Sequence, residues 1–248
     1  ISEFLKLICG KDAVKILDAY RETIAVIIPE ITVMFNFNQN NIHHSYDLWQ
    51  HTLTALGTIE PNPILRMTML LHDIGKPSVK TTDNSGQSHF QGHQLESKKI
   101  ADRILHRLRL PSDFINKTLL LIEYHDVRFN GSKKLMKKVM NVLGTDLTKQ
   151  LLEVEYADIS AQSEYQREEK LGYLETAKTH LNEIIKDNEC FKLSQLDING
   201  KDVLNLGVKE GRDVGNILDY LLMLVVDANV PNKKSILISK AKEYIYGN

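Results

Sequence analysis

The apolar residues of this chain recur mostly at spacings of three and four positions, which is the period of a helix buried on one side. Residues 1–28 show this pattern first, and Pro29 ends that segment. Residues 35–41 are polar and rich in turn formers, so we expect them to connect it to the next helix. Ser45 is the expected N-cap of that helix, which runs through Leu56.

The pattern continues in helical segments with short breaks. Pro63 is expected to open a helix that ends at His72, because Gly75 and Pro77 stop it. Residues 78–92 are polar and allow a small hairpin. Further helices are predicted at 93–109, 112–125, 133–143, 147–162 and 165–187. We find no convincing order of strands and no internal repeat, so the predicted fold class is all-α.

The last segment differs from the rest of the chain in its residue pattern. Glycines are spread through residues 200–215, and a strongly apolar helix begins at about Leu218. A domain boundary near residue 190 is therefore expected. The chain also starts without Met and already in helical rhythm, which is typical of a piece of a longer protein.

Composition narrows the class of protein. Among 248 residues, 42% are hydrophobic and 25% charged, as in an ordinary globular protein, and the formal net charge is -1. That charge predicts no strong overall attraction to nucleic acid or anionic membranes. No apolar stretch approaches the roughly 20 residues of a membrane span. Cys9 and Cys190 lie far apart in no zinc-ligand spacing, so a reducing, cytoplasmic location is expected.

Several costly polar residues fall where a helix face should be apolar. His51, His72 and Asp158 each lie on the apolar stripe of a predicted helix, and Asp73 follows His72 directly. A buried carboxylate is unfavourable unless it is paired, protonated or bound to a cation. Such groups on separate helices suggest a shared divalent metal, which bundles commonly hold between facing helices. Imidazole and carboxylate ligands together suit Mn, Fe, Co, Ni or Zn.

Each residue alone also has a simpler interpretation. A single His on an apolar face is more often a hydrogen-bonded core residue, and Asp158 alone would suit a salt bridge to Arg66 or Arg103. A His-Asp dipeptide is weak evidence, because the chain holds a second one at His125-Asp126. The joint occurrence of all four groups favours the metal.

The order His51, His72-Asp73, Asp158 resembles the H…HD…D ligand pattern of the HD superfamily of metal-dependent phosphohydrolases. Longer stretches resemble the HD-containing carboxyl-terminal half of bacterial CCA-adding tRNA nucleotidyltransferases: Pro29-Glu30, Gln39 and residues 43–53, 72–77, 90–97, 198–203 and 206–208. The resemblance implies an HD-domain helical bundle with extra terminal helices. It divides the chain into a neck-like segment over 1–40, an HD metal-binding domain over 41–190 and a helical tail over 191–248.

The resemblance also implies roles for individual residues. The first divalent ion, which is Mn, Ni, Fe, Co or Mg, would be held by His51, His72, Asp73 and Asp158. His93 and His125 would complete a second metal site with Asp73 bridging, or else hold the phosphate or act as general acid. Lys76 is expected to neutralise substrate phosphate, although a solvated loop lysine is an equal alternative. The predicted catalytic residues are Asp73, Lys76, His93 and His125.

The predicted function is a divalent-metal phosphohydrolase acting on phosphomonoesters or nucleotide phosphodiesters, with 2′,3′-cyclic nucleotides, 2′-nucleotides or RNA-end phosphates as candidate substrates. Hydrolysis of dinucleoside polyphosphates is a weaker candidate. The alternative is a non-catalytic tRNA-binding body, for which basic runs such as Lys133-Lys134, Lys137-Lys138 and Lys98-Lys99 are the clues. The family's polymerase head, with its Gly-rich turn and Asp-x-Asp metal pair, has no counterpart here. The chain is therefore expected to be the tail of such an enzyme or a headless relative.

Overall fold

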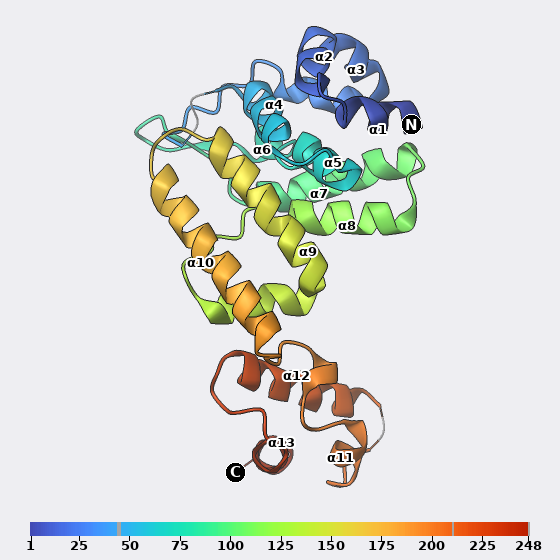
Figure 1. The fold of residues 1–248 in the computed structure, drawn as a ribbon, viewed down its shortest axis with the longest axis vertical. Helices are drawn as coiled ribbons and strands as arrows, with labels where there is room; N and C mark the ends of the chain where they lie inside the picture. Colours follow the sequence, from blue (N-terminus) through green and yellow to red (C-terminus); the bar gives the residue numbers. More distant parts are fainter. Residues whose placement is uncertain (44–45, 210, 248) are drawn as a thin grey trace. The chain divides into compact units, whose positions relative to one another are not determined.

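The protein is described by a computed structural model over residues 1–43, 46–209 and 211–247. Its elements are nearly all helices, which confirms the expected all-α fold (Figure 1). The one sheet among these residues pairs β1, Thr81–Thr82, with β2, Ser88–His89, in antiparallel order, and this is the small hairpin that the sequence allowed. The contacts divide the chain into two compact units, residues 1–128 with 146–175 and residues 129–145 with 176–248. The expected division at residues 40 and 190 stays a prediction.

The amino-terminal stretch of the first unit is broken into short helices rather than a long one. These are α1 Ser2–Ile8, α2 Ala13–Ala19, α3 Arg21–Ile27 and the 3₁₀ helix η1 Pro29–Met34. Gly10 and Asp12, both poor helix formers, separate the first two. Each piece buries one apolar side, through residues such as Ile8, Leu17 and Ile24.

Two helices with side-chain caps follow. Helix α4, Leu48–Thr58, starts after Asp47, whose carboxylate accepts a hydrogen bond from the Gln50 N–H at 2.8 Å. The cap therefore comes two residues later than expected, and Ser45 lies outside the described residues. Helix α5, Pro63–Leu71, has Pro63 at its first turn as expected, and the Asn62 side chain caps it.

A glycine fixes the turn after α5. Helix α6 spans Lys76–Val79 and α7 spans His93–Arg107. A Cβ atom on Gly75 would lie 2.5 Å from the Ser97 nitrogen and 2.7 Å from the His93 carbonyl oxygen, so no larger residue fits without a shift. The turn is also tied down by the Gly75 N–H, which donates to Ser97 Oγ at 2.9 Å. This close approach brings His72-Asp73 beside the first residue of α7.

The remaining helices match the expected segments closely. They are α8 Ser112–Tyr124, α9 Lys133–Ala161 and α10 Arg167–Lys186, and α7 packs along α8, which also packs on α5 (Figure 1). Helix α9 is kinked at Gly144, whose φ of 72° lies in the left-handed region that favours glycine. That kink is the break expected between 143 and 147.

The second unit has a hydrophobic core of its own. Besides parts of α9 and α10 it contains η2 Leu193–Gln195, α11 Gly200–Leu204, α12 Arg212–Val226 and α13 Lys234–Tyr246. Val203, Leu221 and Leu237 are fully buried in this core. Across the described residues, no helix is both long and apolar enough to cross a membrane.

Candidate metal centre

The imidazoles and carboxylates singled out from the sequence meet inside the first unit. They come from α4, the end of α5, the start of α7, the end of α8 and α9: His51, His72, Asp73, His93, His125 and Asp158. Their ligand atoms form two groups, and within each group all the atoms lie within 4.8 Å of one another. The structure therefore brings together every residue that was expected to bind metal.

The first group, here called site A, consists of His51, His72, Asp73 and Asp158. His51 Nε2 lies 2.9 Å from Asp158 Oδ1 and 3.5 Å from Asp73 Oδ2. His72 Nε2 lies 3.2 Å from Asp73 Oδ2 and 3.4 Å from Asp158 Oδ1. Two imidazole nitrogens and two carboxylate oxygens thus face a common centre.

The second group, site B, consists of Asp73, His93 and His125. Asp73 Oδ1 lies 3.2 Å from His93 Nε2 and 3.5 Å from His125 Nε2. Because site A uses Oδ2 of the same carboxylate, Asp73 presents one oxygen to each group. With one oxygen in each group, Asp73 would be able to serve as a ligand in both sites.

All four histidines are oriented in the same way, by a backbone carbonyl beside Nδ1. The pairs are His51 with Ala161 O at 3.3 Å, His72 with Met69 O at 2.7 Å, His93 with Phe90 O at 2.9 Å and His125 with Ile122 O at 2.7 Å. A carbonyl oxygen can only accept, so Nδ1 carries the proton and Nε2 of each neutral ring is a lone-pair acceptor. Histidines that bind a metal through one ring nitrogen commonly donate the other N–H to a backbone carbonyl in this way.

The centre is consequently a buried cluster of acceptors facing acceptors. Among the described residues, His72 Nε2 and both Asp73 oxygens lack a well-oriented hydrogen bond. Burial disfavours a charged His72 ring, but the nearby charge of Asp73 outweighs burial and raises the pKa of His72 to about 10. Without a metal the cluster therefore draws in protons. A divalent cation would balance the same negative charge, so these residues fit the expected divalent metal ion.

Lys76 is buried at the same carboxylate. Its side chain is only 6% exposed, and Nζ lies 2.6 Å from Asp73 Oδ2 and 3.1 Å from Gln39 Oε1. Burial would raise the pKa of Asp73, but the charges of His72 and Lys76 hold it well below the usual range. Lys76 is therefore not the solvated loop lysine of the alternative interpretation, although its contact with phosphate stays a prediction.

Three polar residues near Asp158 were missed in the sequence. Gln162 Nε2 donates to Asp158 Oδ2 at 2.8 Å, and Lys170 Nζ donates to Gln162 Oε1 at 2.6 Å. Glu155 is buried, and burial together with the negative charges of Asp158 and Asp126 raises its pKa well above the usual value. Gln162 and Glu155 carried a readable signal, because they lie four residues after and three residues before Asp158, whereas Lys170 did not.

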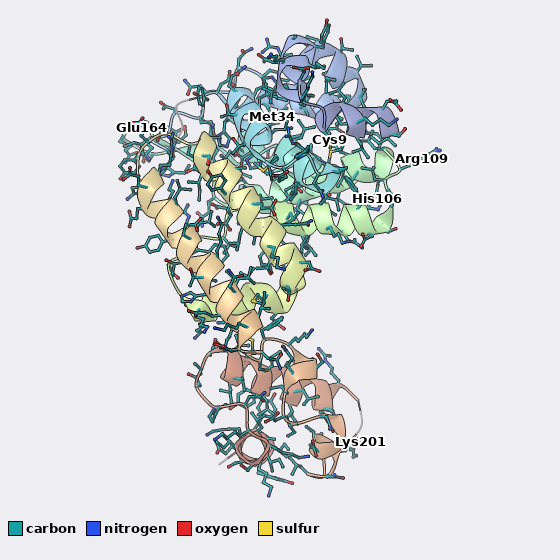
Figure 2. The ribbon with its side chains drawn as sticks, viewed as in Figure 1. Cys9, Met34, His106, Arg109, Glu164 and Lys201 are labelled. Atoms are coloured by element: carbon teal, nitrogen blue, oxygen red, sulfur yellow. The ribbon has the colours of Figure 1, made fainter. Side chains whose placement is uncertain are left out.

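Two other histidines, His89 and His106, lie away from both sites. His89 is on β2 with Nε2 2.8 Å from Asp83 Oδ2, and it belongs to neither site. His106 is exposed on α7, and Figure 2 shows it on the opposite side of the first unit from Glu164, which marks the turn between α9 and α10. His44 lies outside the described residues. Arg66, a suggested partner of Asp158, donates instead to the Glu60 carbonyl at 3.2 Å.

The basic run of α9 is paired with acidic residues of the second unit. Lys133 and Lys137 lie 2.5 and 2.6 Å from Glu189 carboxylate oxygens. Lys134 and Lys138 lie 3.1 and 3.0 Å from Asp227 Oδ1. This pairing weakens the main sequence clue for contacts with tRNA phosphates.

Comparison with known proteins agrees with the resemblance seen in the sequence. The profile of the family described as tRNA nucleotidyltransferase domain 2 matches residues 93–241. The chain belongs to this family. His93, His125 and Asp158 fall inside the matched range, whereas His51 and His72-Asp73 precede it.

Curated relatives point the same way. The chain is 30% identical over 221 residues to the CC-adding tRNA nucleotidyltransferase of Thermus thermophilus, covering 85% of the chain and 48% of that protein. It is 28% identical over 129 residues to the multifunctional CCA protein of Legionella pneumophila, covering 48% and 31%. The A-adding tRNA nucleotidyltransferase of Deinococcus radiodurans is 30% identical over 107 residues, covering 41% and 24%. The chain thus spans half or less of the length of these relatives.

Proposed function

We propose that this chain carries a divalent-metal-dependent phosphohydrolase site of the HD superfamily. The observation that supports this most strongly is the shared Asp73 carboxylate, which directs Oδ2 at two histidines in site A and Oδ1 at two histidines in site B. Isolated core histidines would not require four Nε2 lone pairs to converge on one buried carboxylate. The clustering therefore favours metal binding over the simpler interpretation of each residue alone.

The separations within each site suit metal ligands. Ligand atoms on opposite sides of a cation are roughly 4.2 Å apart, since each bond is about 2.1 Å long, and the observed spread stays within 4.8 Å. Nitrogen and oxygen ligands suit Mn, Fe, Co or Ni, with Mg a weaker match for so many imidazoles. A bound divalent ion would supply an activated water and polarise a phosphoryl oxygen.

Residues of the chain would orient the ligands of this site and add positive charge to it. Asp73 would serve both site A and site B, and Lys76 would orient the Asp73 carboxylate while adding positive charge near the phosphate. If only site A is filled, the Nε2 atoms of His93 and His125 would remain to bind the phosphate or donate a proton to the leaving oxygen. Phosphomonoesters and nucleotide phosphodiesters are the proposed substrates. Among them we favour 2′,3′-cyclic nucleotides, 2′-nucleotides and RNA-end phosphates, because the relatives are named as tRNA nucleotidyltransferases.

Metal analysis and an assay series test this proposal. The purified chain is analysed for bound metal and assayed on bis-p-nitrophenyl phosphate and 2′,3′-cyclic AMP with added Mn, Ni, Co or Mg. Asp73→Asn should lose metal and turnover, whereas Asp113→Asn, at an exposed position in the first turn of α8, should retain both. Absence of metal and of Asp73-dependent turnover in every condition would refute the hydrolase.

A second candidate is a tRNA-binding body that serves a nucleotide-adding head. Membership of the tRNA nucleotidyltransferase domain 2 family favours it, while the paired lysines of α9 count against tight binding. The two functions are compatible. A tRNA gel-shift series across salt concentrations tests it, because phosphate contacts weaken steeply and predictably with salt.

A further inference from the structure

Site A is most exposed at Asp158. The Asp158 side chain is 15% exposed, whereas those of His51, His72 and Asp73 are at most 1% exposed. A phosphate group that reaches site A would therefore approach past Asp158. The residues around this carboxylate are the ones that substrate would meet first.

A polar chain leads outward from Asp158 to a lysine. Asp158 directs Oδ1 at His51 and His72, and its other oxygen accepts from Gln162 Nε2 at 2.8 Å. The Gln162 carbonyl then accepts from Lys170 Nζ at 2.6 Å. The amide is thus oriented with its donor toward the carboxylate and its acceptor toward the ammonium. This orientation holds a half-buried cation at the exposed edge of site A.

The connection between α9 and α10, which carries Gln162 and leads to Lys170 near the start of α10, is held by hydrogen bonds to residues 42 and 43. The Ser163 N–H donates to the His43 carbonyl at 2.9 Å, and Ser163 Oγ donates to the Ile42 carbonyl at 2.7 Å. His43 Nδ1 lies 3.4 Å from Lys170 Nζ, and its ring contacts Tyr165 at a centroid distance of 5.1 Å. Figure 2 labels Glu164 in this turn. The position of Lys170 is therefore set by contacts from both sides of the turn.

The local charge balance favours an incoming anion. Burial lowers the pKa of Lys170, and the positive charges of Arg128 and Lys76 add to this effect, while Asp158 and Asp126 oppose it. A cation bound in site A would compensate Asp158. Of the charges that act on Lys170, the cations Arg128 and Lys76 and the single carboxylate Asp126 would then remain.

We propose that Lys170 binds the substrate phosphate at the exposed edge of site A and that Gln162 positions its ammonium group. The inference rests on the proposed hydrolase function and assigns that site a residue for recognising its substrate. Lys76 is less available for the same task, because its ammonium group is buried against Asp73. A lysine suits phosphate as a compact point charge with three donors.

Binding of inorganic phosphate to the Mn-loaded full chain tests the proposal directly. Lys170→Met should raise the phosphate Kd and the KM for bis-p-nitrophenyl phosphate about tenfold, the size of one lost charge-assisted hydrogen bond. Lys170→Arg should restore most of the affinity, and Lys186→Met, at an exposed position on the same helix, should match the wild type. Metal content should be equal in all four proteins.

The positioning action of Gln162 is tested by a double-mutant cycle. Gln162→Leu should weaken phosphate binding in the wild type but add little in the Lys170→Met background, because both changes remove the same interaction. Additive losses would show that Gln162 acts independently of Lys170.

The two levels of the proposal fail in different ways. An unchanged phosphate Kd in Lys170→Met would overturn the assignment of Lys170 even if the wild type hydrolyses its substrates. A wild type without metal or turnover would instead overturn the proposed function. Selective loss of phosphate binding in Mn-loaded Lys170→Met supports the assignment even without turnover, because the binding measurement needs only the metal-loaded chain.

Discussion

Nε2 of His93 lies 3.1 Å from Nε2 of His125, although the Nδ1 atoms of both rings face backbone carbonyls at 2.9 and 2.7 Å. Two neutral rings in this orientation would place their lone pairs against each other, with Asp73 Oδ1 close by. Such a contact is stable only when a proton or a metal cation lies between the acceptors. The contact between the two rings at site B therefore requires either a shared proton or a bound cation.

Removal of one imidazole should separate the two sites. We expect His93→Ala to lower the Mn content by one ion per chain while site A keeps its own, because Asp73 Oδ2, His51, His72 and Asp158 are untouched. Elemental analysis after dialysis measures this stoichiometry. His106→Ala, on the exposed face of the same helix, is the control and should leave it unchanged. Equal metal content in both variants would show that site B does not bind an ion.

The Gly75 turn should be sensitive to a single methyl group. A Cβ atom there would lie 2.5 Å from the Ser97 nitrogen and 2.7 Å from the His93 carbonyl, and both contacts are to backbone that cannot move aside easily. We expect Gly75→Ala to lower the free energy of unfolding by about 1–3 kcal/mol, as overpacking commonly does. Metal affinity should fall as well, because the turn carries Asp73 toward His93.

A second glycine provides the matched control for that substitution. Gly172 lies inside α10, and a Cβ atom there would meet nothing within 4 Å. Gly172→Ala should therefore raise the free energy of unfolding by about 0.5–1 kcal/mol. Urea unfolding of both variants gives the comparison. Similar effects of the same sign would show that the close approach at Gly75 is unimportant.

The buried Glu155 carboxyl should make stability depend on pH. Burial and the charges of Asp158 and Asp126 raise its pKa well above the usual value of 4.5, so the folded chain keeps a proton that the unfolded chain releases. The corresponding stability is present below pH 4.5 and is lost as pH rises toward the folded pKa. Glu155→Gln keeps shape and neutrality, so its advantage over the wild type should grow from pH 5 to pH 8.

Urea unfolding in EDTA at several pH values measures this difference. EDTA is needed because a metal at Asp158 would alter the charge that Glu155 meets. Glu169→Gln, at an exposed position in the first turn of α10, should show a difference from the wild type that does not vary with pH. A constant difference for Glu155→Gln as well would mean that Glu155 is ionised in the folded protein.

The sequence predicted the helices well, because their ends carry local signals. Pro63 and the break near Gly144 are such signals, and both act in the structure as expected. The amino-terminal stretch was read as one helical rhythm, yet it forms three short helices, because apolar periodicity continues across breaks at Gly10 and Tyr20. Periodicity therefore records which side faces the core more reliably than where a helix ends.

The candidate site was readable only where polar residues interrupt an apolar face. The chain holds two His-Asp dipeptides, and in both the histidine follows the last residue of a helix, yet Asp73 is buried and Asp126 is exposed. Local sequence does not distinguish them, since the difference comes from the close approach of α7 at Gly75. Lys170 looks like an ordinary helix residue, and only tertiary packing brings it from α10 to Asp158.

The paired lysines of α9 allow a last prediction about tRNA. Lys134 and Lys138 lie 3.1 and 3.0 Å from Asp227 Oδ1, so one carboxylate already offsets part of their charge within the second unit. If both bound phosphates, replacing them with Gln would reduce the slope of log affinity against log salt by roughly 1.4–1.8, at about 0.7–0.9 per contact. We expect a change well below this value, close to that of Lys201→Gln, an exposed residue of α11 labelled in Figure 2. A reduction by the full amount expected for two contacts would show that tRNA displaces Asp227 from the two lysines. The basic run of α9 would then be a nucleic-acid contact.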